Sequence, residues 1–306
     1  MAGSPYVPAP TDRSFGAATV LFGAGNGKYP DGNAVLVAGR DRTALIDPTL
    51  TVHARGGELA DSVDLVLLSH AHEDHLAGLS RFPEAEVHVN EADRQGVVHL
   101  EGLMAVYGML DADFEREWRV ELTDTFHFRG RPDVRTFGEG AVFDLGGARV
   151  SVVHLPGHTR GHSGFLVEPG GFFFLADIEL TGFGPYYGDA WSDLDDMERS
   201  LARCAEIDAR WFGTFHHKGV YEDRQEYLAA LSEFREIIAR RDAAMLEFLA
   251  EPATLDELIA HRFVYRPGVD LGWVDTAERR TVTAHLNRLI PAGQVVEVEP
   301  GRYRRA

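Results

Sequence analysis

Four potential metal ligands occur close together in one short stretch of the chain. Residues 67–78 read LLSHAHEDHLAG, so an apolar run leads directly into His70, His72, Asp74 and His75. If strand geometry continues, His70 and His72 point to the same side, because alternate side chains of a strand share a face, and they could hold one cation. Asp74 and His75 lie beyond the strand, where a turn could present them to a second cation. Imidazole nitrogen and carboxylate oxygen suit zinc, and also iron or manganese.

The alternative to a metal site is a polar loop that carries surface histidines. Packing alone rarely places four ligand-type side chains within six residues directly after a buried strand. Under the strand geometry, Ala71 and Glu73 face away from the cations, and Glu73 is expected to be solvated. The motif therefore predicts a metal centre at the carboxyl end of this strand.

Three later segments each end an apolar run near a residue that could bind a metal. His158 lies in LPGHTRGHSG, Asp177 in FFFLADIEL and His216 in WFGTFHHKG. Taken alone, a histidine at the end of a strand is more often structural than a ligand, and Asp177 could simply cap or turn the chain. Their order after the first motif makes them candidates for the same site.

The pattern His-x-His-x-Asp-His after an apolar strand resembles the signature of the metallo-β-lactamase superfamily. The resemblance extends from about residue 18 to residue 219, and the later segments follow in the order of that family. It implies an α/β fold, a four-layer αβ/βα sandwich of two mixed β-sheets flanked by helices. It also implies two divalent metal ions per chain, zinc first and iron or manganese as alternatives. The ligands would be His70, His72, Asp74, His75, His158, Asp177 and His216.

The resemblance assigns a role to each later ligand. His158 matches the third histidine of the first metal site, Asp177 the aspartate that bridges both metals, and His216 the last ligand of the second metal. The chain departs from the family where His217 follows His216, since one histidine is usual there. His216 is preferred, because TFHH then parallels the family's residue-Gly-His-Gly pattern. His162 is expected to be a neighbour that hydrogen-bonds near the metals.

Short apolar runs that end in turn residues predict the strands that must carry these ligands. They occupy residues 18–23, 33–39, 43–48, 63–70 and 86–90, then 141–147, 148–158, 164–168, 172–177 and 210–217. Helical spacing predicts helices within 91–120, over 193–207 with Asp193 as the cap, and over 224–249. Strands dominate two successive stretches, each followed by helices, which predicts two βα halves packed together with the helices outside.

The pattern changes after about residue 240. A short capped helix is predicted at 254–258, a second helix at 276–293, and two strands within 294–306. Helix, helix and β-hairpin is the order of a small winged-helix unit. We therefore expect a metallo-β-lactamase-like catalytic domain at 1–240 and a winged-helix-like C-terminal domain at 241–306.

Net charge, cysteine content and the length of apolar runs limit the classes of partner that this protein could bind. The formal charge of −18 disfavours a protein that grips nucleic acid over its whole surface, because phosphate binding needs positive charge. The single cysteine, Cys204, cannot form an internal disulfide and is expected to be a buried small residue. No run approaches the roughly 18 apolar residues that span a membrane, and the amino end does not read as a signal peptide. These features predict a cytoplasmic protein without a membrane partner, while a homodimer is an open alternative.

Two metals suggest a hydrolytic reaction. Two adjacent divalent cations lower the pKa of a water between them, and the resulting hydroxide could attack a carbonyl or phosphorus atom. Asp74, which could accept a proton, and Asp177 are the predicted catalytic residues. Tyr186 and Tyr187 in GFGPYYGD are the predicted substrate-binding residues; such a tyrosine could donate to a substrate oxygen or merely pack. The segments 23–33 and 91–140 could border the cleft, or the latter could be plain structural helices.

The family does not select the reaction, since it spans thioesterases, lactonases, β-lactamases, nucleases and sulfur dioxygenases. We expect a metal-dependent hydrolase acting on a small-molecule ester, thioester or lactone, because the acidic chain disfavours nucleic acid. One enzyme alternative is a mononuclear iron sulfur dioxygenase that retains His70, His158 and Asp177. Another is a phosphodiesterase or nuclease.

The non-enzymatic alternative is a metal-domain sensor with a DNA-binding tail. An exposed cluster of Arg279, Arg280 and Arg288 would favour it.

Overall fold

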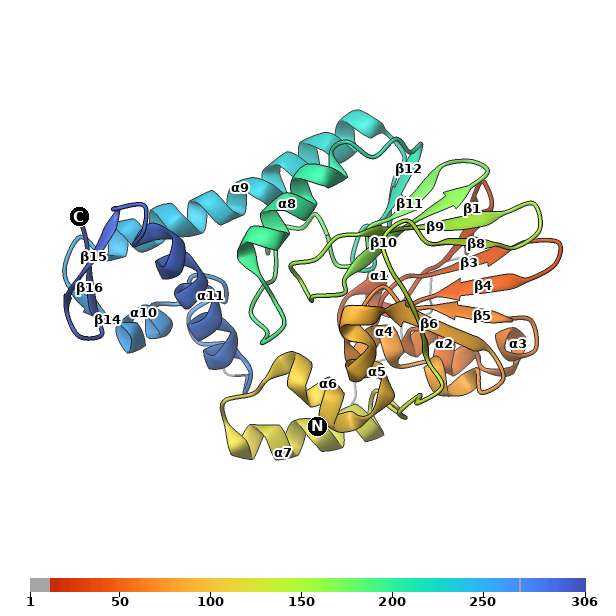
Figure 1. The fold of residues 1–306 in the computed structure, drawn as a ribbon, viewed down its shortest axis with the longest axis horizontal. Coiled ribbons are helices and arrows are strands. Elements are labelled where there is room, and N and C mark those ends of the chain that lie inside the picture. Colours follow the sequence, from red (N-terminus) through yellow and green to blue (C-terminus); the bar gives the residue numbers. More distant parts are fainter. Residues whose placement is uncertain (1–11, 270) are drawn as a thin grey trace.

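Two mixed β-sheets lie face to face in a computed structural model that describes residues 12–269 and 271–306 (Figure 1). The first has the order β1 (Arg13–Phe15), β2 (Ala18–Leu21), β3 (Ala34–Ala38), β4 (Thr43–Ile46), β5 (Leu65–Leu67), β6 (Glu86–Asn90) and β7 (Arg135–Phe137). Its strands are antiparallel from β1 to β4 and parallel from β4 to β7. The sequence interpretation of the amino end falls largely on residues 1–11, outside the described residues.

The second sheet repeats this mixture of strand directions. Its order is β13 (Val220–Tyr221), β12 (Trp211–Gly213), β11 (Phe172–Phe174), β10 (Ser163–Glu168), β9 (Arg149–His154) and β8 (Val142–Asp144). Strands β11 and β12 run parallel, and the other neighbours run antiparallel. The predicted strands are therefore present, and β1, β7 and β13 are short pieces at the sheet edges that the sequence patterns did not indicate.

Helices cover the outer faces of both sheets. The chain segments of the first sheet carry α1 (Ala24–Gly27), α2 (Leu50–Arg55), α3 (Gly57–Ala60), α4 (Glu73–Leu76), α5 (Arg94–Val98), α6 (Leu100–Tyr107) and α7 (Ala112–Asp124), with short 3-10 turns η1 (Leu79–Arg81) and η2 (Glu91–Asp93). The second sheet carries α8 (Leu194–Cys204) and α9 (Arg224–Phe248). Asp193 caps α8 as predicted, since its side chain accepts a hydrogen bond from the backbone N–H of Asp196.

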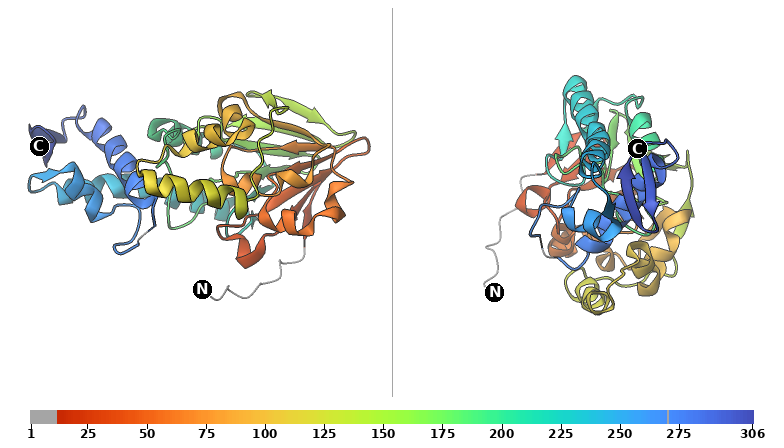
Figure 2. Two further views of the ribbon diagram at one scale, coloured as in Figure 1. Left: turned by 90° about the horizontal axis from the view of Figure 1, so that it is seen from below. Right: turned by 90° about the vertical axis from the view of Figure 1, so that its left-hand side faces the viewer.

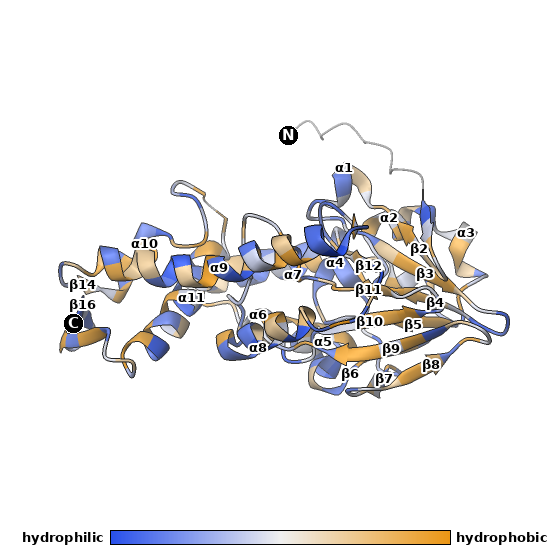
Figure 3. Ribbon diagram, turned by 90° about the horizontal axis from the view of Figure 1, so that it is seen from above, coloured by the Kyte–Doolittle hydropathy of each residue, from blue (hydrophilic) through white to orange (hydrophobic). Residues whose placement is uncertain are grey.

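Alternation of side chains along the strands separates these layers. In β5, Leu65 and Leu67 pack between the sheets, whereas Val66 packs with the helices of the first sheet. In β11, Phe172 and Phe174 pack between the sheets, whereas Phe173 packs with α8 and α9. Hydrophobic residues accordingly fill the strands in Figure 3. Three buried cores between helix, sheet, sheet and helix confirm the predicted four-layer sandwich.

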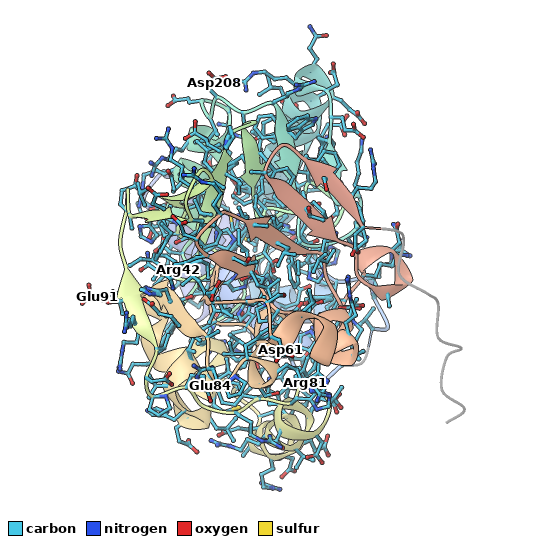
Figure 4. The ribbon with its side chains drawn as sticks, turned by 90° about the vertical axis from the view of Figure 1, so that its right-hand side faces the viewer. Arg42, Asp61, Arg81, Glu84, Glu91 and Asp208 are labelled. Carbon is cyan, nitrogen blue, oxygen red and sulfur yellow. The ribbon has the colours of Figure 1, made fainter. Side chains whose placement is uncertain are left out.

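Most charged side chains lie on the outside of this sandwich, whereas a few, Asp47, Glu73 and Asp93 among them, are buried. Figure 4 shows the end away from the C-terminal helices, with these charged residues labelled: Arg42, Asp61, Arg81, Glu84, Glu91 and Asp208. Among the described helices, none combines the length and apolar character needed to cross a bilayer.

A small unit extends from one end of the sandwich (Figure 2). It contains β14 (Ala253–Thr254), α10 (Leu255–His261), α11 (Val274–Leu289), β15 (Val295–Glu299) and β16 (Arg302–Arg305), with the sheet order β14-β16-β15. Thr254 and Glu257 form the predicted capping box of α10. The predicted helix, helix and hairpin order is present. Helix α9 runs unbroken through residue 240, and its C-terminal end contributes to the core of this unit. The domain boundary at 240/241 therefore stays a prediction.

Helix α11 packs against the sandwich through a buried polar chain. The hydroxyl of Tyr187 lies 2.9 Å from Nε2 of His285, whose Nδ1 lies 2.6 Å from Asp242 of α9. Burial lowers the pKa of His285, so its imidazole is neutral near pH 7, with Nδ1 donating to Asp242 and Nε2 accepting from Tyr187. Asp242 also pairs with Arg288 at 2.9 Å.

The arginines of the sensor alternative do not form a free cluster. They contact different partners: Arg279 pairs with Asp256, Arg280 donates to the carbonyls of Tyr107 and Gly108, and Arg288 pairs with Glu198 and Asp242. Helix α11, the second helix of this unit, buries one face against the sandwich rather than exposing it. These contacts remove the observation that would have favoured a DNA-binding tail.

Replacing Tyr187 by Phe should lower the free energy of unfolding by about 1–3 kcal/mol, because the buried His285 would lose a hydrogen-bond donor. Chemical denaturation followed by circular dichroism measures the change. Tyr303→Phe is the matched control, since Tyr303 is only half-buried on β16, and should change stability by less than about 0.5 kcal/mol. Equal losses in both variants would contradict a specific role for the Tyr187 hydroxyl.

Candidate metal centre

The ends of four strands meet at one edge of the sandwich. His70 lies in a bend directly after β5, His72 has extended backbone, and Asp74 and His75 lie in the first turn of α4. The other candidates follow β9, β11 and β12, which are neighbours or near neighbours in the second sheet. Both sheets thus deliver polar side chains to the same edge, as the predicted βα halves require.

A first group of ligand atoms gathers around His72. Its Nδ1 lies 3.1 Å from Nε2 of His70 and 3.0 Å from Nε2 of His158. Oδ2 of Asp177 lies 3.2 Å from Nε2 of His158 and 3.9 Å from Nε2 of His70. These four residues offer one ligand atom each, all within 4.8 Å of one another.

A second group lies on the other side of Asp177. Its Oδ1 lies 3.0 Å from Nε2 of His75, which lies 3.9 Å from Oδ1 of Asp74. Oδ2 of Asp74 lies 3.1 Å from Nε2 of His216. The two carboxylate oxygens of Asp177 therefore face different groups, which is the arrangement required of a bridging ligand.

These distances fit a cation better than direct contacts. Ligands at about 2.1 Å from a tetrahedral ion are about 3.4 Å apart, close to the separations in both groups. Among the described residues, neither Nε2 of His75 nor Oδ1 of Asp177 has a hydrogen-bond partner of suitable geometry, although both atoms are buried. Buried polar atoms are rarely left unsatisfied. The residues therefore form groups that could hold metal ions.

Each imidazole is oriented from behind by its other nitrogen. Four of the partners are at hydrogen-bond geometry: Ser69 Oγ for His70 at 2.9 Å, Asp47 Oδ2 for His75 at 2.8 Å, the Tyr186 carbonyl for His158 at 3.1 Å and the Gly27 carbonyl for His216 at 3.0 Å. For His72 the partner is Asp189, whose Oδ2 lies 3.0 Å from Nε2 as an ion-pair contact. Such partners fix the ring plane and the tautomer that presents a lone pair to a metal.

Asp47 and Asp93 are two supporting residues that sequence reasoning missed. Asp47 ends β4 with a left-handed backbone (φ 53°) and also accepts from the N–H of Ser69 at 2.7 Å. Asp93 accepts hydrogen bonds from Ala71 N at 3.1 Å and Gly161 N at 2.8 Å. It thereby joins the first motif to the loop that carries His158. Asp47 ends the apolar segment TALID, and this position at the end of a predicted strand could have identified it from the sequence. No local sequence pattern identifies Asp93.

The adjacent residues His216 and His217 lie in different environments. His216 is buried and borders the cavity, whereas His217 is half-exposed in a left-handed conformation (φ 59°) and its backbone N–H donates to the Gly27 carbonyl at 3.1 Å. His162 lies behind the cluster, where its Nε2 accepts from the backbone N–H of Asp177 at 3.2 Å and its Nδ1 donates to the Leu155 carbonyl at 2.9 Å. This is the neighbouring position expected for His162.

Neighbouring charges keep the carboxylates ionised. Burial raises the pKa of Asp177, but His75 and His158 outweigh it and hold that pKa well below its ordinary value. Burial likewise opposes ionisation of Asp74, and His75 and His216 lower its pKa. Metal ligands must be deprotonated, so both carboxylates are in the form that binds a cation.

A cavity of about 270 Å³ opens in front of both groups. It is bordered by His72, Asp74, His158, Asp177 and His216 on the ligand side, and by Tyr29, Glu73, Tyr107, Met109, Trp118, Glu179, Phe183, Tyr186, Asp189, Tyr265 and Trp273 elsewhere. The segments 23–33 and 91–140 both contribute, so the latter does cover the cleft. The C-terminal unit adds Tyr265 and Trp273, which the sequence did not indicate.

Two expectations about side chains near the cavity are corrected. Glu73 is buried rather than solvated, because Tyr29 and Tyr107 donate to its two oxygens at 2.9 and 2.6 Å. Tyr187 does not reach the cavity, because its side chain packs in the core under α8 and α9 and its hydroxyl meets His285. Tyr186 does border the cavity, and its hydroxyl donates to Asp189 at 3.1 Å.

Comparison with known proteins agrees with this geometry. The pattern of the Metallo-beta-lactamase superfamily matches residues 29–236. A probable metallo-hydrolase of Mycobacterium tuberculosis is 30% identical over 115 residues, 37% of this chain and 36% of that protein, so the match spans about a third of this curated relative. An acyl-coenzyme A thioesterase of Gallus gallus is 31% identical over 204 residues, 58% of this chain and 69% of that protein.

A solved structure extends the likeness over the whole chain. The metallo-beta-lactamase family protein of Thermus thermophilus superposes with a TM-score of 0.66 and 26% sequence identity, covering 98% of this chain and 97% of that one. Since the superfamily pattern covers well over half of the sequence, and the fold and His/Asp groups agree with it, this chain belongs to the metallo-β-lactamase superfamily.

Proposed function

We propose that this protein is a metal-dependent hydrolase that uses two divalent cations, zinc first, to cleave a small ester, thioester or lactone. The observation that carries the proposal is the position of Asp177, whose two oxygens face two separate sets of ligand atoms. When bound, such cations would polarise the substrate carbonyl and lower the pKa of the attacking water. Zinc, iron and manganese all suit these ligands.

The residues around the cavity support water as the nucleophile. No serine, threonine, cysteine or lysine is found among the described residues that border it. Cys204 is fully buried in the core under α8, and burial raises the pKa of its thiol to about 12, so it is not a nucleophile. In the reaction, the water oxygen bonds to the acyl carbon and the bond to the leaving oxygen or sulfur breaks. The products are a carboxylic acid and an alcohol or thiol.

Asp74 and Asp177 divide the catalytic work between them. Asp177 fixes the spacing of the two groups, and its backbone is held by His162 after a left-handed Ala176 (φ 49°). Asp74 borders the cavity, where a carboxylate oxygen can take the proton released by the water. Glu179 also borders the cavity, and burial raises its pKa to about 7.

The choice of a carbonyl substrate rests on two further supports. The relative from Gallus gallus is named as a thioesterase, which is an acyl-transfer reaction to water. The described lining of the cavity contains no lysine or arginine that could bind a phosphate group away from the metal ions. A mononuclear dioxygenase would require only His70, His158 and Asp177, and would leave the buried Asp74, His75 and His216 without a role. A cytoplasmic location and a homodimer stay predictions.

Removing metal with a chelator should abolish hydrolysis of activated thioesters, because the ligands alone cannot polarise a carbonyl. Adding zinc, manganese or iron should restore it, with about two ions per chain by elemental analysis. Circular dichroism of the chelated protein controls for unfolding. Full activity in folded, metal-free protein would contradict the proposal, and oxygen uptake with a persulfide in place of hydrolysis would favour the dioxygenase.

His216→Asn should lose about one metal per chain and most activity, because the shorter side chain cannot place a ligand atom at the position of Nε2. His217→Asn is the matched control, since asparagine tolerates the left-handed backbone at that position. It should keep both metals. Loss of metal only in His217→Asn would transfer the ligand role to His217.

Asp177→Asn should reduce kcat by at least about a hundredfold and change KM much less, because the bridge acts on the attacking water rather than on substrate binding. Steady-state kinetics on metal-loaded protein measure both constants. An increase in KM with an unchanged kcat would contradict a catalytic role for Asp177.

A further inference from the structure

Much of the cavity wall is aromatic, and three separate segments of the chain build it. Tyr107 and Trp118 come from α6 and α7, Phe183 from the loop after Asp177, and Tyr265 and Trp273 from the C-terminal unit. The ring centroids of Trp118 and Trp273 are 5.8 Å apart, and those of Phe183 and Tyr265 are 5.5 Å apart. These contacts make one continuous surface from the sandwich to the C-terminal unit.

Three of the four tyrosine hydroxyls that border the cavity in the described part of the chain already have acceptors. Tyr29 and Tyr107 donate to Glu73, and Tyr186 donates to Asp189. Burial and these carboxylates raise the pKa of each of the three tyrosines, so they stay neutral donors. With their hydroxyls engaged, the rings contribute mainly apolar surface to a substrate.

The charge of the wall disfavours anions. Glu73, Glu179 and Asp189 border the cavity in addition to the ligand carboxylates. No lysine or arginine borders it among the described residues, and residues 1–11 and 270 contain neither type. The nearby guanidinium of Arg241 is directed to the carbonyls of Phe183 and Pro185. A carboxylate or phosphate at the end of the acyl group away from the metal ions would therefore be buried without a cationic partner.

We propose that the cavity selects an uncharged, apolar acyl group, and that Tyr265 and Trp273 of the C-terminal unit are specificity-determining residues for it. This inference rests on the proposed hydrolase function. Burial of acyl methylenes against the aromatic wall strengthens binding by about fourfold for each methylene.

Glu278 positions this part of the wall. It is fully buried on α11, and its carboxylate accepts from the backbone N–H groups of Phe263, Val264 and Tyr265 at 3.1, 3.0 and 2.8 Å. Three backbone donors on one buried carboxylate fix the segment that carries Tyr265 relative to the helix that follows Trp273. Glu278 touches no cavity surface, so it acts through the residues it holds.

The test uses the full-length, metal-loaded protein with N-acetylcysteamine thioesters, whose leaving group is uncharged. Hexanoyl thioester should exceed both acetyl and adipoyl thioester in kcat/KM by at least about tenfold. Adipoyl has the length of hexanoyl and ends in a carboxylate, so the pair isolates charge. Equal or better hydrolysis of adipoyl thioester overturns the inference and leaves the proposed function intact.

Binding without turnover separates the two proposals. Hexanamide should quench tryptophan fluorescence at a concentration at least about tenfold lower than adipic monoamide, since only the latter carries a carboxylate. If the protein hydrolyses no ester, thioester or lactone, the proposed function fails, and this ranking still decides the character of the cavity. Equal binding of both amides overturns the inference.

Variants locate the specificity in the C-terminal unit. Trp273→Ala should lower kcat/KM for hexanoyl thioester by about tenfold, mainly through KM, and change acetyl thioester by less than about twofold. Trp273→Phe should recover most of the preference. Tyr303→Ala, an aromatic truncation in the same unit away from the cavity, is the control. A parallel loss for both substrates in Trp273→Ala would overturn the assignment.

Glu278→Gln gives a second route if Trp273→Ala folds poorly. The amide NH2 of glutamine cannot accept a hydrogen bond, so one of the three backbone N–H groups would lose its acceptor. The hexanoyl preference should therefore fall, while the metal content stays near that of the wild type. Glu257→Gln makes the same change in the exposed capping box of α10 and should keep the preference. An unchanged hexanoyl preference in folded Glu278→Gln overturns the positioning role.

Discussion

Buried ionisable groups need close partners, and this requirement governs the architecture around the cavity. A carboxylate or imidazolium taken out of water without compensation costs several kcal/mol. Here Asp177 lies between two sets of imidazoles, and each imidazole has a partner on its far side. Those partners come from the ends of β4 and β5, from the loop after β11 and from the turn at α1. The sheets must therefore meet at this edge with little freedom, and the three hydrophobic cores supply the rigidity.

The first ligand motif could be predicted from sequence because its geometry is local. Alternation after β5 places His70 and His72 on one side, and the turn into α4 redirects Asp74 and His75. His158, Asp177 and His216 could be proposed only through their order along the chain, since no local pattern relates them. The four-layer fold was predictable because alternate residues of each strand belong to different cores.

The errors share a physical cause, which is that they depended on long-range contacts. Glu73 is predicted to face away from the cations and to be solvated, but Tyr29 and Tyr107 reach it from segments distant in sequence. Tyr187 adjoins Tyr186, yet its hydroxyl meets His285 of the C-terminal unit. Asp93 has no local signature. It supports the site because it accepts hydrogen bonds from both Ala71 and Gly161. The C-terminal wall of the cavity was missed for the same reason.

The spread of the ligand residues along the chain has a consequence for synthesis of the protein. The first four ligand residues leave the ribosome together, but Asp177 and His216 follow more than a hundred residues later. A nascent chain can thus offer a cation an incomplete set of ligands long before the bridge exists. Contacts between residues so distant in sequence form late, because closing long loops costs entropy. The cavity closes later still, when the segment around Trp273 has emerged and α11 has docked, so the complete site forms only at the final stage of folding.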